Sequence, residues 1–220
     1  MLNHLAAEVL LIYAELDAQV AAFAAASGLH CPQGCGECCG SEKVEATVLE
    51  MLPLAFALFA DGQAELLIKR LEKVNGQGEC LLHRPDLAGP GAWSCTCYSH
   101  RGVVCRLFGF AGNLDRGGIP RLALCRVMRQ ADLSGEHPLP LEEEVLALMP
   151  LFSEAGMRIT ALHPGLGTIR LPINSALLEA LQKVGIALEL GAGQQLGSDV
   201  LPIDPPDEPP FAAPPLPKAA

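Results

Sequence analysis

Four of the chain's nine cysteines lie within nine consecutive residues, 31 to 39, which read CPQGCGECC. Proline and glycine separate Cys31, Cys35 and the adjacent pair Cys38 and Cys39, so the stretch cannot continue a regular helix or strand. A loop of this composition can turn back on itself and bring its sulfur atoms toward one centre. What these thiols bind or form therefore decides how the first half of the chain folds.

Disulfides, ordinary buried thiols and metal ligands are the three interpretations of so many cysteines. Disulfides need an oxidising compartment and an even count, and two adjacent cysteines pair only through a strained ring. A lone buried cysteine is a small hydrophobe, but four in nine residues are not scattered. Thiolates are soft ligands that suit zinc and iron–sulfur clusters, so the pattern predicts metal binding. The remaining cysteines are Cys80, Cys95, Cys97, Cys105 and Cys125.

The spacing leaves both metals open. Cys35 and Cys38 have the spacing of one half of a tetrahedral zinc site. Adjacent Cys38 and Cys39 fit poorly on one small ion and better on different irons of a cluster, or on two sites. Eight thiolates could make two four-cysteine sites or one cluster with cysteines in reserve. The expected cofactor is an iron–sulfur cluster, such as 4Fe-4S, ahead of Zn2+.

The formal charge of −10 argues against a nucleic-acid partner, which would require a basic face. Between residues 93 and 130, however, arginine is frequent and only one acidic residue, Asp115, occurs. These arginines form either a solvated basic face or a counter-charge for metal-bound thiolates. They are Arg101, Arg106, Arg116, Arg121, Arg126 and Arg129.

No membrane span or export signal is expected. The longest uninterrupted apolar run, residues 54–60, has seven residues, whereas a bilayer requires about 20. The N-terminal stretch carries Glu8, Glu15 and Asp17 and does not open with a basic residue. We therefore expect a cytoplasmic protein.

Apolar residues at intervals of three and four predict a helix over residues 2–25, ended by Gly28. The capping box Thr47-Val48-Leu49-Glu50 predicts the start of a second helix, which Pro53 should kink or restart. Glycine and proline dominate from residue 75 to 135, where we expect loops. Three more helices are predicted over 63–74, 141–155 and 175–188, and short strands over 91–109.

These elements predict a mainly α protein with short irregular strands and loops, a small α+β fold organised around a cysteine-ligated metal cluster. Residues 1–135 form the N-terminal helix and the cysteine-cluster domain, and residues 136–198 a helical extension packed on it. Residues 199–220 form a proline-rich, disordered tail, since eight of the 18 prolines lie between positions 201 and 217. Such a tail could dock a protein partner as an extended segment.

The first cluster resembles the signature of the YkgJ-like cysteine-cluster family, whose label is a zinc- or iron-chelating domain. The segment from Cys95 to Phe108, CTCYSHRGVVCRLF, resembles that family's C-x-[IV]-Y-x-x-R-P-x-x-C-R-x-[FY] block. Cys97 stands at the usual Ile or Val position and Gly102 at the usual proline. The resemblance implies eight metal ligands: Cys31, Cys35, Cys38, Cys39, Cys80, Cys95, Cys105 and Cys125.

We expect a metal-binding protein whose centre has a structural, redox or sensing role. Flagellin lysine N-methylases have a similar cluster, so an iron–sulfur enzyme that uses S-adenosylmethionine is the alternative. The chain lacks a glycine-rich strand-to-helix site for that cosubstrate, and the α/β barrel that radical enzymes with a CxxxCxxC motif require. His30, His83 and His100 lie near cysteines and are either loop residues or substitute ligands.

Overall fold

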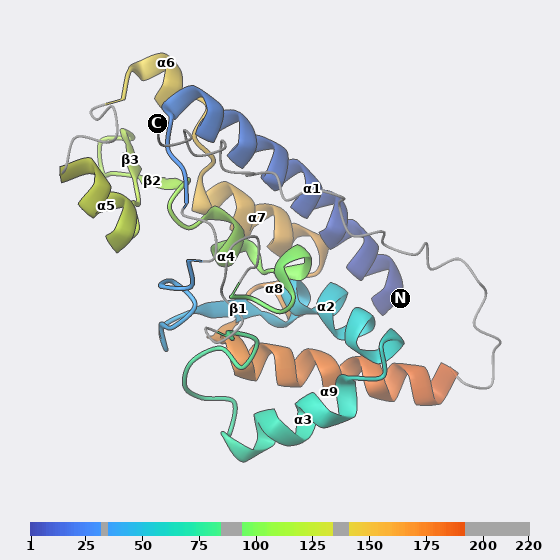
Figure 1. Ribbon diagram of the computed structural model, residues 1–220. Coiled ribbons are helices and arrows are strands. Elements are labelled where there is room, and N and C mark those ends of the chain that lie inside the picture. The colour runs from blue at the N-terminus through green and yellow to red at the C-terminus, as the bar shows by residue number, and fades with distance from the viewer. Residues whose placement is uncertain (32–34, 85–93, 134–140, 192–220) are drawn as a thin grey trace, which may run out of the picture.

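The computed structural model describes residues 1–31, 35–84, 94–133 and 141–191, and it is mainly helical (Figure 1). The first helix, α1 (Leu2–Ser27), confirms the predicted N-terminal helix. It ends where expected, because Gly28 adopts a left-handed conformation (φ 69°) and donates its N–H to Ala24 O. One face of α1 enters the core through Val9, Tyr13 and Phe23.

Among the described residues, α1 is also the one helix with the length and apolar composition of a membrane span. Length and composition alone do not distinguish a membrane span from the core helix of a soluble protein. In this fold α1 contacts α2 (Val48–Ala60), α4 (Val103–Leu107) and α7 (Phe152–Leu162). Its apolar stripe is therefore used for packing within the chain.

The capping box at the start of α2 is confirmed. Thr47 Oγ1 accepts the Glu50 N–H at 3.2 Å, and the Glu50 carboxylate accepts the Thr47 N–H at 3.1 Å. Pro53 neither breaks nor restarts the helix, which is continuous to Ala60, so that part of the prediction was wrong. Burial explains why, because Leu49, Leu52 and their neighbours fix α2 in the core.

The C-terminal helix α9 (Ile173–Gly191) confirms the last predicted helix and packs on α2 and on α3 (Ala64–Lys73). A two-stranded antiparallel sheet precedes it, formed by β1 (Glu45–Thr47) and β4 (Arg170–Pro172). Ile173 continues this pairing by donating its N–H to Val44 O at 2.9 Å. The sheet joins the segment after the first cysteine loop to the C-terminal helix, and the predicted division at residue 135 stays a prediction.

Two sequence-based expectations were wrong. In place of strands, residues 94–109 form a 3-10 turn, Tyr98–His100, and α4, while the strands β2 (Gly112–Leu114) and β3 (Pro120–Leu122) follow later. The helix expected over 141–155 is split into α6 (Glu143–Leu146) and α7, because Pro150 lacks an N–H and Leu151 is extended. Residues 85–93 and the predicted tail lie outside the described residues. The remaining helices are α5 (Arg126–Leu133) and α8 (Pro164–Gly167).

Candidate metal centre

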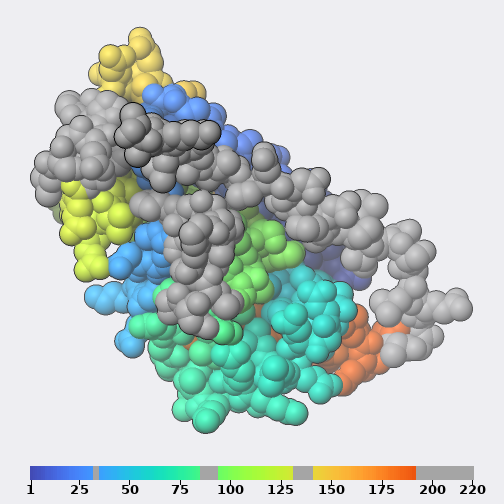
Figure 2. Space-filling model, viewed as in Figure 1, coloured from blue at the N-terminus to red at the C-terminus, as the bar shows by residue number. Residues whose placement is uncertain are grey.

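All nine cysteines lie in the described part of the chain, none is in a disulfide, and each side chain is half-buried. The loop that contains the first four lies between α5 and the segment before residue 85 (Figure 2). Free thiols that are neither exposed nor deeply buried are suited to binding a thiophilic metal. The structure thus brings cysteines from four separate stretches of the chain into one region.

A first group of thiols surrounds Cys31. Burial raises the pKa of Cys31 to about 12, and the neighbouring thiols of Cys35, Cys38 and Cys125 add to the rise. An ion pair between Arg126 and Glu37 joins the start of α5 to the first cysteine loop, and this places Cys125 beside it. The Cys125 sulfur also accepts the N–H of Met128 at 3.3 Å, within the first turn of α5.

A second group is built around Cys105 on α4. Burial raises the pKa of Cys105 to about 12, and the thiols of Cys80, Cys38 and Cys95 contribute to the rise. Cys80 and Cys95 are held together by a local strand bridge, in which His83 pairs with Cys95 and donates its N–H to Cys80 O at 2.9 Å. These contacts place three thiols from two loops and a helix in one neighbourhood.

Cys38 and Cys39 lie between the two groups. The Cys39 thiol donates a hydrogen bond to Cys38, which lowers the pKa of Cys38 and raises that of Cys39. Cys95 and Cys105 also raise the pKa of Cys39, whereas Cys38 adds to the rise at both Cys31 and Cys105. The adjacent pair is therefore the point at which the two groups meet.

The donor set fits zinc or an iron–sulfur cluster in its chemistry, because it consists of soft, unoxidised thiols. The side chains of this donor set are, however, not yet arranged around a single point. Among the described residues, no three His, Cys, Asp or Glu side chains are close enough to hold one metal ion. A site of this kind seldom exists before the metal binds, so loading would require the loops to close by a small movement.

Gly36 lets the first loop approach the Cys80–Cys95 region closely. A Cβ at this position would lie 2.5 Å from His83 Nε2 and 2.7 Å from Ser94 Oγ, both closer than real Cβ contacts. Ser94 is itself 2% exposed and accepts the Arg84 N–H through its carbonyl oxygen, so its backbone has little room to move. The close approach explains why glycine is needed between Cys35 and Cys38.

We expect Gly36→Ala to destabilise the metal-loaded protein by about 1–3 kcal/mol and to weaken metal binding, because the extra methyl group separates the loops. Gly40→Ala is the matched control in the same loop, since its Cβ would lie 3.7 Å from His83 Cε1, an ordinary contact. Thermal unfolding of the two variants measures the difference. Equal melting temperatures would show that the loops do not pack as described.

A residue far from the cysteines in sequence positions Cys80. Asn174, at the start of α9, is 1% exposed and accepts the Leu81 N–H at 3.0 Å. Its amide donates to the carbonyl oxygens of Gln77 and Glu79, at 3.1 and 2.8 Å. The C-terminal helix therefore fixes the loop that leads to Cys80, a role that no local sequence signal indicated.

A buried carboxylate positions α4 in a similar way. Glu50 is 1% exposed, and besides its capping contacts with Thr47 it accepts the Val103 N–H at 2.8 Å. Its own carbonyl oxygen accepts the Tyr13 hydroxyl at 2.8 Å. Glu50 thus links α1, α2 and the first residue of the helix that contains Cys105.

The remaining candidate ligands are placed as follows. Cys97 Sγ lies 3.9 Å from Thr96 Oγ1, and burial and the Cys95 thiol raise its pKa. His83 lies against Gly36, whereas His100 Nδ1 is 3.0 Å from Ser99 Oγ. His83 is therefore placed within the cysteine region.

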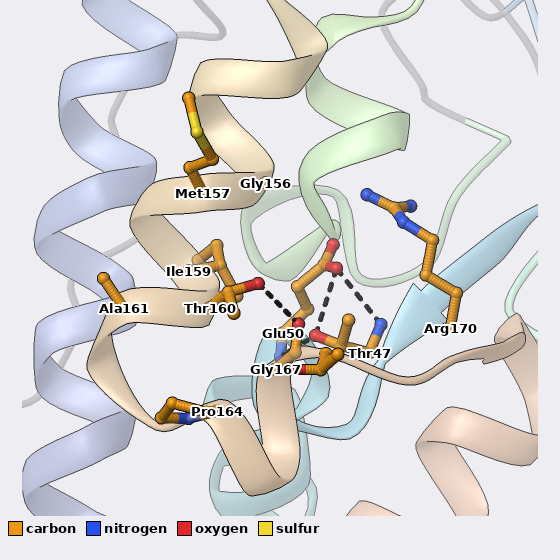
Figure 3. Close-up of a pocket in the computed structure, with 11 residues that line it drawn as sticks. Thr47, Glu50, Gly156, Met157, Ile159, Thr160, Ala161, Pro164, Gly167 and Arg170 are labelled. Atoms are coloured by element: carbon orange, nitrogen blue, oxygen red, sulfur yellow. Dashed lines mark hydrogen bonds between the residues drawn. The ribbon is translucent and has the colours of Figure 1, made fainter.

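One hollow on the described surface is separate from the thiols. It has a volume of about 490 Å³ and lies between α7, α8 and the β1–β4 sheet (Figure 3). Thr47 and Glu50 line its inner side and Arg170 its edge, and none of its 11 lining residues is a cysteine. Glu50 joins the hollow to the cysteine region, because it lines the hollow and accepts the Val103 N–H.

Comparison with known families indicates metal binding. Residues 30–129 match the CxxCxxCC family, described as "Putative zinc- or iron-chelating domain". The match confirms the predicted resemblance and includes all nine cysteines, from Cys31 to Cys125. No curated protein and no solved structure gives a match.

Proposed function

Since residues 30–129 form a domain of the zinc- or iron-chelating CxxCxxCC family, we propose that this chain holds metal at two neighbouring four-thiolate centres. The division follows the two groups of thiols and assigns one member of the adjacent pair to each centre. The first centre comprises Cys31, Cys35, Cys38 and Cys125. The second comprises Cys39, Cys80, Cys95 and Cys105.

The observation that carries this proposal is that thiols far apart in sequence lie in one region of the fold, where the ion pair of Arg126 with Glu37 holds Cys125 beside the first cysteine loop. Cys31 is affected by Cys125, 94 residues later, and Cys39 by Cys95 and Cys105. Like charges placed this close repel when the thiols ionise, unless a cation lies between them. A bound metal removes the repulsion and satisfies the sulfurs together.

Four thiolates are the number that a zinc ion takes in a structural site and that an iron–sulfur cluster takes as well. The adjacent cysteines favoured a cluster when all eight thiols were considered around one centre. Divided between two centres, they fit either metal equally. A structural role suits both, because the metal would tie together loops with little regular secondary structure, in the reducing cytoplasm that keeps thiols free.

Single substitutions test the division. We expect Cys31→Ser to lose the metal of the first centre and keep that of the second, and Cys105→Ser to do the reverse. Each variant should therefore retain about half of the wild-type metal, measured per chain after anaerobic purification. Cys97→Ser is the control and should retain all of it.

Two results would contradict the two-centre arrangement. If either substitution removes all the metal, the eight thiols share one centre. If Cys97→Ser loses as much metal as Cys105→Ser, the ligand assignment of the second centre is wrong.

A further inference from the structure

One arginine in the cysteine region is held rigidly and lacks a carboxylate partner. The Arg101 guanidinium lies 3.4 Å from the centre of the Tyr98 ring. Its Nε donates to Tyr98 O at 2.9 Å, and Nη1 donates to Cys105 O at 3.3 Å. Stacking and two hydrogen bonds fix the guanidinium beside α4, so its position does not depend on a mobile side chain.

Three other arginines of the same segment are neutralised within the described residues. Arg106 pairs with Asp17, Arg126 with Glu37, and Arg121 with Asp115. In the described part of the chain, Arg101 contacts carbonyl oxygens and an aromatic ring but no carboxylate. Its positive charge is therefore available to other anions nearby.

This charge lies beside a proposed ligand of the second group. Arg101 Nη1 donates to the carbonyl oxygen of Cys105, and the Tyr98 ring on which the guanidinium stacks belongs to the segment that joins Cys97 to Cys105. The guanidinium is therefore held against the helix that contains Cys105.

A divalent ion bound by four thiolates has a net charge of −2, which a half-buried site must offset. We propose that Arg101 is the counter-charge of the second centre, where it stabilises the metal-bound thiolates without being a ligand. The inference rests on the proposed function. It selects one arginine from the basic segment by its geometry and its free charge.

The test compares Arg101→Gln and Arg101→Lys in the full-length chain, with Zn2+ titrated against a chromophoric chelator. We expect Arg101→Gln to weaken Zn2+ binding at the second centre by about 10–100-fold, the usual effect of removing an outer-sphere partner. Zn2+ binding at the first centre should stay unchanged. Arg101→Lys should recover part of the lost affinity, because lysine restores the positive charge but not the planar guanidinium that stacks on Tyr98. Arg121→Gln is the matched control, since Asp115 neutralises that arginine.

A purely structural role predicts a different pattern. In that case both Arg101 variants would lose affinity equally, at both centres, and Co2+-loaded protein would show the wild-type thiolate charge-transfer band once saturated. We expect instead a shifted band in Arg101→Gln and a nearly normal one in Arg101→Lys.

The failure of this inference and that of the proposed function are distinguishable. Wild-type protein that binds no Zn2+ and contains neither iron nor acid-labile sulfide overturns the proposed function. Wild-type protein that binds two ions, with Arg101→Gln binding both as tightly, overturns only the role of Arg101.

Discussion

Removing the metal is expected to unfold the cysteine-bearing loops and to leave the helical core folded. The apolar core of α1, α2 and α9 is formed by residues such as Phe23, Leu52 and Leu181, and none of its buried described residues is a cysteine. The loops around Gly36, Cys80 and Cys95, in contrast, are held in the described part of the chain by turns, one strand bridge and the hydrogen bonds of Asn174. Metal binding to thiolate sites supplies about 10–16 kcal/mol in small zinc domains, so its loss exceeds what these few hydrogen bonds provide.

Hydrogen exchange before and after treatment with a chelator measures this effect residue by residue. Amides of residues 36–40, 80–84 and 94–100 should lose protection, whereas those of α2 and α9 should keep theirs. The same treatment of a Cys31→Ser, Cys105→Ser double variant is the control, because it has little metal to lose. Unchanged protection of the loops after the metal has been removed would show that they fold without it.

Glu50→Gln is expected to lower the free energy of unfolding by about 3 kcal/mol. The carboxylate accepts three hydrogen bonds, from the Thr47 N–H, the Thr47 hydroxyl and the Val103 N–H. An amide has one acceptor oxygen, so its NH2 group would face at least one buried donor that is left without a partner. The substitution therefore weakens the cap of α2 and frees the start of α4, on which Cys105 lies.

Chemical denaturation of the metal-loaded protein measures this loss. Glu179→Gln is the matched control, since Glu179 lies on the surface of α9 in an ion pair with Lys183 and should change stability by less than about 0.5 kcal/mol. Glu50→Gln should also weaken metal binding at the second centre. If both variants unfold at the same denaturant concentration, Glu50 does not link these helices.

Local patterns predicted much of this fold. Helical spacing and Gly28 placed α1, and the capping box placed α2 through the reciprocal bonds of Thr47 and Glu50. The low helix propensity of proline was misleading where burial determines the structure, because Pro53 is held inside α2 by the core. Propensity was also misleading at residues 103–107, a short segment rich in β-branched and apolar residues that forms a helix in place of a strand.

Contacts between distant residues could not be predicted in this way. Asn174 bonds to Leu81, 93 residues away, and nothing in the local sequence at either position indicates it. The pairing of β1 with β4 and the contact of Arg106 with Asp17 are equally remote. The cysteines could be recognised as candidate ligands from their clustering, but their division into two groups required the fold. Their assignment as ligands stays a prediction.

Metal analysis of the wild-type chain tests the central claim most directly. Protein purified without oxygen should contain either two zinc ions per chain, or iron with an equivalent amount of acid-labile sulfide, and no disulfide. Protein that is folded, fully reduced and free of both metals would contradict the account.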